Sequence, residues 1–153
     1  MSVSPPASEQ SHLANQRLAF GLARIGLGLN IALHGLVRLP NLSGFAAGMR
    51  DSFGQSPLPP SLVYATSLAI PVAEALVGVL LLVGIRVRDL LVAGTLLMLL
   101  LIGGACSAQN WNAASIQMIY LAFYVVLLAT VHLDHLSIDA WRRSGPASKG
   151  TQP

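Results

Sequence analysis

Four long apolar segments constrain this chain more than any other feature of its sequence. They cover about residues 17–38, 61–84, 89–109 and 114–133. At about 1.5 Å per helical residue, each segment is long enough to cross a hydrocarbon layer of roughly 30 Å. The second and third segments lack the polar face that a soluble helix turns toward water. The sequence therefore predicts an all-α fold, an integral membrane bundle of four transmembrane helices.

The composition agrees with a membrane protein. Of the 153 residues, 54% are hydrophobic and only 10% are charged. A soluble domain of this size could not bury that much apolar surface, because small domains have a high ratio of surface to volume. The chain has no basic run interleaved with aromatic residues, so we expect no nucleic-acid partner. Its single cysteine, Cys106, excludes an internal disulfide.

The polar segments define the domain organisation. Residues 1–16 are predicted to be a disordered polar lead, and they do not have the pattern of a signal peptide. Residues 17–139 are predicted to form the membrane domain, and residues 140–153 are predicted to be a flexible polar tail. The longest connection, about residues 39–60, is rich in Gly, Pro and Ser and is predicted to be a loop. The short segment GIRVRD forces a tight antiparallel hairpin of the second and third helices.

The distribution of Lys and Arg predicts the orientation of the bundle. Cytoplasmic flanks of membrane helices carry an excess of these residues. One side of the predicted bundle has six of them, namely Arg17, Arg86, Arg88, Arg142, Arg143 and Lys149. The opposite side has Arg38 and Arg50. Both termini are therefore expected in the cytoplasm.

Arg24 lies well inside the first apolar segment, and Glu74 lies well inside the second. Each would cost roughly 2.5–3.5 kcal/mol at the centre of a membrane helix. Because the two helices run antiparallel and both residues lie at similar depth, we predict that they form an ion pair inside the bundle. Two interpretations stay open: a packing clamp that fixes the register, or a site for a proton or a quinone headgroup.

Helical spacing places each of these residues on a defined face. Steps of three and four residues bring together Gly21, Arg24, Gly28, Ile31 and Gly35 on the first helix. The same spacing brings together Ser67, Pro71, Glu74 and Gly78 on the second. Small residues on the first face would let a neighbouring helix approach closely.

A second polar group is expected near the opposite side of the membrane. His34 lies one turn from Asn30, and imidazole can exchange protons near neutral pH. Gln117, Tyr120 and Tyr124 share one face of the fourth helix and would contact a quinone or a polar headgroup. The alternative is an interfacial aromatic belt. No metal site is predicted, because the histidines lack further ligands at suitable spacing.

Three segments carry a resemblance to a known family. The stretch ARIGLGLNIALHGLVRL resembles the first helix of the DoxX family, IPVAEALVGVLLLVGIRVR resembles its second helix, and HLSIDAW resembles its closing element. The resemblance covers about residues 18–143. It implies a four-helix protein of the bacterial inner membrane, with Arg24, His34 and Glu74 at the family's polar positions. The third helix lacks the family's histidine, and Gln117 stands where members often have glutamate.

The resemblance implies the first of two functional hypotheses. The chain would be a subunit of a quinone-linked redox system that acts on thiosulfate or thiols or in oxidative-stress defence, as in a thiosulfate:quinone oxidoreductase complex. Glu74, Arg24 and His34 would be catalytic, and Gln117, Tyr120 and Tyr124 would contact the quinone. Quinone is the sole cofactor that this hypothesis invokes. The expected partners are the lipid bilayer and a membrane or periplasmic redox protein, and an oligomer stays open.

The second hypothesis is a non-catalytic membrane anchor or assembly subunit for a partner protein. The polar residues would then hold helices together. The 39–60 connection would be the docking surface on the outer face. The redox subunit is the function that we predict from the sequence, and the anchor or assembly subunit is the alternative.

Overall fold

The predicted all-α membrane bundle is confirmed. A computed structural model describes residues 6–143, which form helices and turns and contain no strand. Four helices in this range are long and apolar enough to cross a membrane. The chain is therefore a multi-pass membrane protein.

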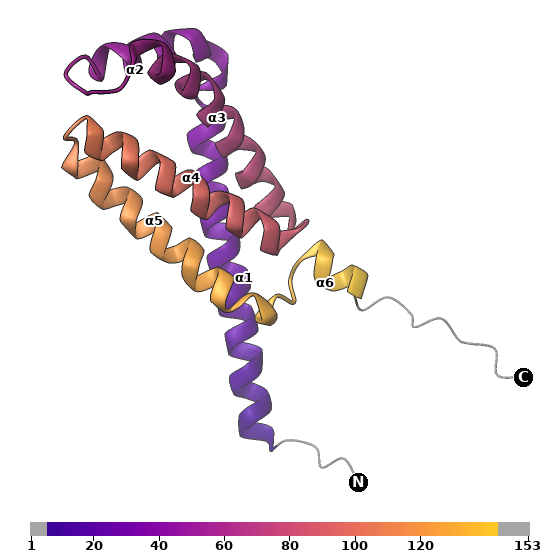
Figure 1. Ribbon diagram of the computed structural model, residues 1–153. Helices are drawn as coiled ribbons and strands as arrows, with labels where there is room; N and C mark the ends of the chain where they lie inside the picture. The colour runs from indigo at the N-terminus through magenta and orange to yellow at the C-terminus, as the bar shows by residue number, and fades with distance from the viewer. Residues whose placement is uncertain (1–5, 144–153) are drawn as a thin grey trace, which may run out of the picture.

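Six α-helices and two short 3-10 helices follow one another along the chain. In order, they are α1 Ala7–Leu36, η1 Leu39–Asn41, α2 Leu42–Ser52, α3 Pro60–Val83, α4 Val87–Ser107, α5 Trp111–Ala129, η2 Val131–Leu133 and α6 Ile138–Arg143. Helix α1 packs along α3, and α4 packs along α5 (Figure 1). Helix α2 lies at one end of the bundle, and α6 lies at the other end, nearer both termini. We call these ends the α2 side and the terminus side.

The ends of the predicted segments differ from the structure in three places. Helix α1 already begins at Ala7, because no proline interrupts the chain from there to Leu36. The predicted 39–60 loop contains α2, which Asn41 caps by accepting a hydrogen bond from the backbone N–H of Gly44 at 3.2 Å. The predicted tail contributes α6. Residues 1–5 and 144–153, which include the rest of the predicted lead and tail, lie outside the described residues.

Small residues bring α1 and α3 into close contact. The predicted α1 face from Gly21 to Gly35 is buried, as is the α3 face that carries Glu74. A methyl group added to Gly35 would meet the backbone of Pro71 and Ala75, and one added to Gly78 would meet the backbone of Ala32. Such close approach of backbones is typical of small-residue interfaces in membranes. It fixes the register of the two helices.

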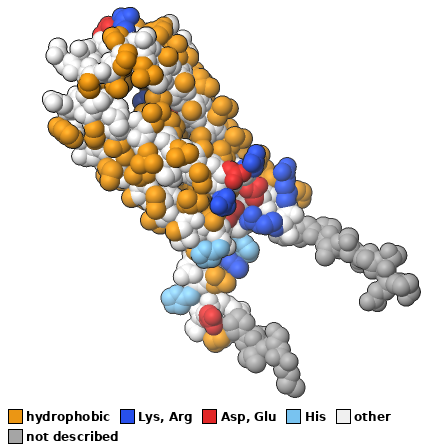
Figure 2. Space-filling model, viewed as in Figure 1, with side chains coloured by type: hydrophobic (Ala, Val, Ile, Leu, Met, Phe, Trp, Pro, Cys, Tyr) orange, Lys and Arg blue, Asp and Glu red, His pale blue; other side chains and the backbone are white. Residues whose placement is uncertain are grey.

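The outer surface of the bundle is suited to lipid. Apolar side chains cover the visible flank of the spans, and charged side chains gather near the terminus side (Figure 2). Several large apolar residues of α4 and α5 are about half exposed, including Leu96, Leu100, Ile119 and Phe123. In a membrane, hydrocarbon chains would cover this surface.

Candidate functional site

The predicted ion pair between Arg24 and Glu74 is wrong. Gly28 lies against Leu81 and Leu82, whereas Gly35 lies against Ala75. This register places Arg24 beside the end of α3, more than one helical turn beyond Glu74 toward the terminus side. Helical rise alone predicts similar depths for the two residues, but the glycine contacts set a different register.

Arg24 instead binds backbone carbonyl groups. Its Nη1 donates to the carbonyl oxygens of Leu81 and Leu82, the latter at 3.2 Å. Its Nη2 donates to the carbonyl of Leu136 at 2.6 Å. The last carbonyls of a helix have no partner within the helix. The buried guanidinium therefore caps α3 and fastens the segment after α5 to it.

Carboxylates complete this arrangement at the terminus side. Oδ2 of Asp139 accepts a hydrogen bond from the N–H of Val87 at 2.8 Å, at the start of α4. The N–H of Asp139 donates to the carbonyl of Gly84 at 3.1 Å. The hydroxyl of Ser137 donates to Asp134 at 2.5 Å and accepts from the N–H of Ala140 at 3.0 Å. We call Arg24, Asp134, Ser137 and Asp139 the C-terminal clasp.

Glu74 pairs with Arg38, which the sequence analysis counts only among the residues of the side opposite the termini. Its Oε2 lies 2.5 Å from Nη1 of Arg38, just after α1. The guanidinium of Arg38 also lies over the ring of Phe45 in α2, 4.9 Å from the ring centre. Glu74 is only 5% exposed. The ion pair thus ties the middle of α3 to the connection between α1 and α2.

Three of the predicted site residues join this pair. His34 packs edge-on against Tyr120, with 6.3 Å between the ring centres. His34 and Tyr124 are both close enough to Glu74 to interact with it electrostatically. We call His34, Arg38, Glu74, Tyr120 and Tyr124 the polar core. It draws on α1, α3 and α5 and joins Glu74 to residues that the sequence analysis places in a separate polar group, with Arg38 where Arg24 was expected.

Several buried polar atoms at and near the polar core lack a hydrogen-bond partner. They are the hydroxyl of Tyr124, Oδ1 of Asn30 and Oε1 of Gln117. Tyr124 is fully buried, with its ring against Gly94 of α4. An unsatisfied buried polar group costs about 1–3 kcal/mol. Pro71, inside α3, has no N–H to donate to the carbonyl of Ser67.

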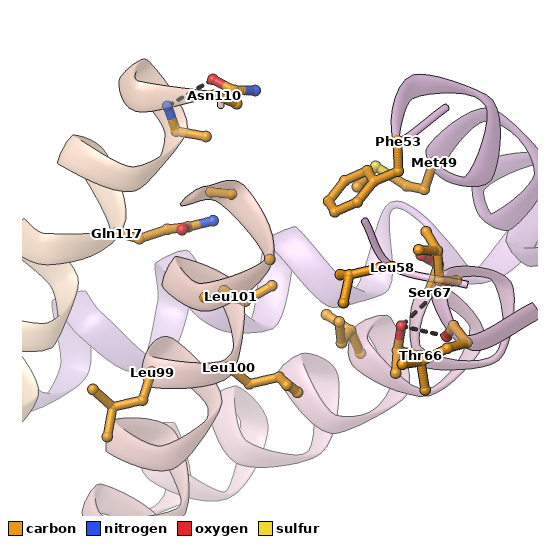
Figure 3. A pocket seen from close by; sticks show the side chains of 17 residues that line it. Met49, Phe53, Leu58, Thr66, Ser67, Leu99, Leu100, Leu101, Asn110 and Gln117 are labelled. Carbon is orange, nitrogen blue, oxygen red and sulfur yellow. Dashed lines mark hydrogen bonds between the residues drawn. The ribbon is translucent and has the colours of Figure 1, made fainter. Parts of the chain in front are cut away.

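A cavity of about 470 Å³ reaches Gln117 from the α2 side. It lies between α3 and α4 and is bordered by α2 and the start of α5 (Figure 3). Ser67, on the same α3 face as Glu74, also lines it. The sequence analysis does not predict this cavity, because it treats residues 39–60 as a loop. A prediction of helix over residues 42–52 would place Met49 on α2 and Phe53 directly after it, both at the cavity.

Within residues 6–143, no group of three or more His, Cys, Asp or Glu side chains could hold a metal ion.

A match to a family model identifies the family of this chain. Residues 16–117 match the model of the methylamine utilisation protein MauE. This chain belongs to the MauE family. The matched range contains Arg24, His34, Arg38, Glu74 and Gln117, whereas Tyr120, Tyr124 and the rest of the clasp lie after it. No curated protein and no solved structure matches the chain.

Membership of the MauE family corrects the DoxX resemblance. The matching model belongs to a different membrane family, so the assignment to DoxX is wrong. The predicted role in a quinone-linked thiosulfate or thiol system rested on that assignment and is also wrong. The features behind the resemblance, namely glycine steps and an acidic residue in an apolar helix, serve close packing and polar pairing in any small membrane bundle.

Proposed function

We propose that this MauE family member is a non-catalytic membrane accessory subunit, which anchors or assembles a partner protein needed for methylamine utilisation. The family description supplies the process. The observation that supports the proposal is that Arg24 and Glu74, the charged residues well inside the spans, both have structural partners. Arg24 binds three backbone carbonyls, and Glu74 binds Arg38. Each holds separate helices in place.

The α2 side provides the surface for the partner. In α2 only Ala46 is buried, and Arg50 and Asp51 form an exposed ion pair at 2.8 Å. The Arg38–Glu74 pair and the Phe45 contact hold α2 against the bundle. The excess of Lys and Arg at the terminus side favours an outward-facing α2 in a bacterial inner membrane. The partner is then a periplasmic protein or a membrane protein with an outer domain.

In this proposal the polar residues position helices. Glu74 and Arg38 set the place of α2, and Arg24 sets the place of α6. The catalytic roles predicted for Glu74, Arg24 and His34 stay predictions, as do the quinone or headgroup contacts of Gln117, Tyr120 and Tyr124.

Growth on methylamine tests the proposal. A methylamine-using bacterium that lacks this gene would be complemented with the wild type or with Glu74→Gln, and the folded protein in its membranes would be quantified. We expect the wild type to restore growth on methylamine as sole nitrogen source without affecting growth on ammonium. Glu74→Gln should reduce growth only in proportion to its lower amount of folded protein. Complete loss of growth at the wild-type protein level would overturn the non-catalytic role.

Site-specific photocrosslinking tests the surface. A photoreactive residue at Arg50 should crosslink one protein whose own loss also prevents growth on methylamine. The matched control is the same residue at Leu96, which is 61% exposed on the flank of α4. Equal crosslinking of that protein from both positions would contradict the assignment of the α2 side.

A further inference from the structure

The cavity between α3 and α4 opens onto the flank of the bundle. Leu62, Leu99 and Leu100 line it and are each about half exposed on the apolar surface. Gly103 also lines it, and a Cβ added there would meet no atom within 4 Å. In a membrane this mouth faces hydrocarbon, so a ligand would enter from the bilayer.

The polar groups that line the cavity indicate which polar group a ligand would need. The Thr66 hydroxyl already donates to the carbonyl of Leu62 at 2.8 Å, and Oδ1 of Asn110 already accepts from the N–H of Ala113 at 3.1 Å. The buried Oε1 of Gln117 has no donor. In Figure 3 the Gln117 side chain extends from α5 toward the space between the helices. The ligand that completes this site supplies an N–H or O–H group.

The lining also excludes a charged head. It consists of apolar side chains, glycines and the neutral polar residues Ser67, Thr66, Asn110 and Gln117, without a charged side chain. A carboxylate or phosphate placed here would lose its hydration without gaining a counter-charge. Ligand pockets of this size, mostly apolar with a few directed polar groups, are typical of sites for small molecules.

We propose that this cavity binds an uncharged lipid with a hydroxyl head, of the monoacylglycerol class. A hydroxyl of the ligand donates to Oε1 of Gln117. Its acyl chain leaves through the mouth beside Leu99, Leu100 and Gly103. The site is distinct from the partner surface on the exposed face of α2, and lipid binding is measured on the purified protein, independently of methylamine utilisation.

Photolabelling tests the site. The purified protein in phosphatidylcholine nanodiscs would be labelled with a monoacylglycerol that carries a diazirine in its acyl chain, and the labelled peptides would be mapped. We expect labelling of α3 and α4 residues at the cavity. Unlabelled monooleoylglycerol should compete for it, and oleate should not. Equal competition by oleate would overturn the uncharged head, and labelling spread evenly over all four spans would overturn the site.

Two variants with matched controls sharpen the test. Gly103→Leu fills the mouth and should abolish labelling, whereas Gly26→Leu, at another open glycine outside the cavity, should not. Gln117→Leu keeps the side-chain volume and should weaken competition by monooleoylglycerol about tenfold, the effect of one lost hydrogen bond. Ser115→Ala, which removes an exposed hydroxyl of α5, is its control. Wild-type labelling in folded Gly103→Leu, or unchanged competition in Gln117→Leu, would overturn the proposal.

Discussion

The two ends of the bundle treat a buried charge differently. At the terminus side, the Arg24 guanidinium binds carbonyl groups at the end of α3 and after α5. Toward the α2 side, the Glu74 carboxylate in the middle of α3 binds another side chain, Arg38, which is itself partly exposed. The first arrangement joins backbone to side chain, and the second joins side chain to side chain.

The ends also differ in what is left unpaired. In the clasp, Arg24 Nε and Asp134 Oδ1 lack partners, but both side chains make other hydrogen bonds. At the polar core, the single polar atom of Tyr124 has no partner at all. A cavity also reaches the nearby Gln117. The difference teaches that the clasp is a structural fastening, whereas the polar core and the cavity beside it leave the Tyr124 hydroxyl and Oε1 of Gln117 without partners.

The largest expected loss of stability comes from a substitution that disrupts the C-terminal clasp. Arg24→Met removes three hydrogen bonds to backbone carbonyls and leaves those groups unsatisfied, so the free energy of unfolding should fall by about 3–5 kcal/mol. Unfolding in mixed detergent micelles measures it, and hydrogen exchange over residues 134–143 should rise. The control is Arg88→Met, an exposed residue whose loss should change stability by less than about 1 kcal/mol. Unchanged exchange over residues 134–143 would show that Arg24 does not fasten this segment.

The next effect tests the ion pair of the polar core. A double-mutant cycle with Glu74→Gln and Arg38→Met should give a coupling energy of about 2–3 kcal/mol, because each residue is the other's ionic partner. The free energies of unfolding of the four proteins measure it. A coupling near zero would separate Glu74 from Arg38. The same cycle with Glu74 and Arg24 should give little coupling, which distinguishes the two ends.

A smaller loss of stability is expected from a substitution at the close contact of α1 and α3, which sets the register of these two helices. Gly35→Ala should lower the free energy of unfolding by about 1–2 kcal/mol, because the added methyl group pushes α3 away. Gly26→Ala is the matched control on the same helix, since a Cβ there meets nothing within 4 Å. Thermal unfolding of both variants decides the point. Equal stability would mean that α1 and α3 are less closely packed than described.

The smallest expected effect comes from substitutions of Asp139, which distinguish the hydrogen bond of its carboxylate from the charge of its carboxylate in the clasp. Asp139→Ala should cost about 1 kcal/mol, the effect of losing a cap on α4. Asp139→Asn keeps an acceptor for the N–H of Val87 and should recover most of this loss. If Asp139→Asn is as unstable as Asp139→Ala, the carboxylate acts through its charge near Arg24 rather than through the cap.

The sequence predicted the spans and the buried faces well, because both follow from local patterns. The lengths of the apolar segments predicted the ends of α3 and α4 to within a few residues. The spacing of three and four residues predicted the buried face of α1 from Gly21 to Gly35. The same spacing grouped Gln117, Tyr120 and Tyr124 on α5. It failed at α2, where Gly and Ser suggested a loop, although Asn41 supplies a cap.

What the sequence by itself determined is that this chain spans a membrane with four helices and buries Arg24 and Glu74. These conclusions rest on hydrophobic length and helical period, which neighbouring residues set. Only the tertiary structure decided the partners of the two charges. The contacts of Gly28, Gly35 and Gly78 fix how far α1 slides along α3, and that distance puts Arg24 at a helix end and Glu74 beside Arg38. Register between helices is a property of packing, so neither helix encodes it alone.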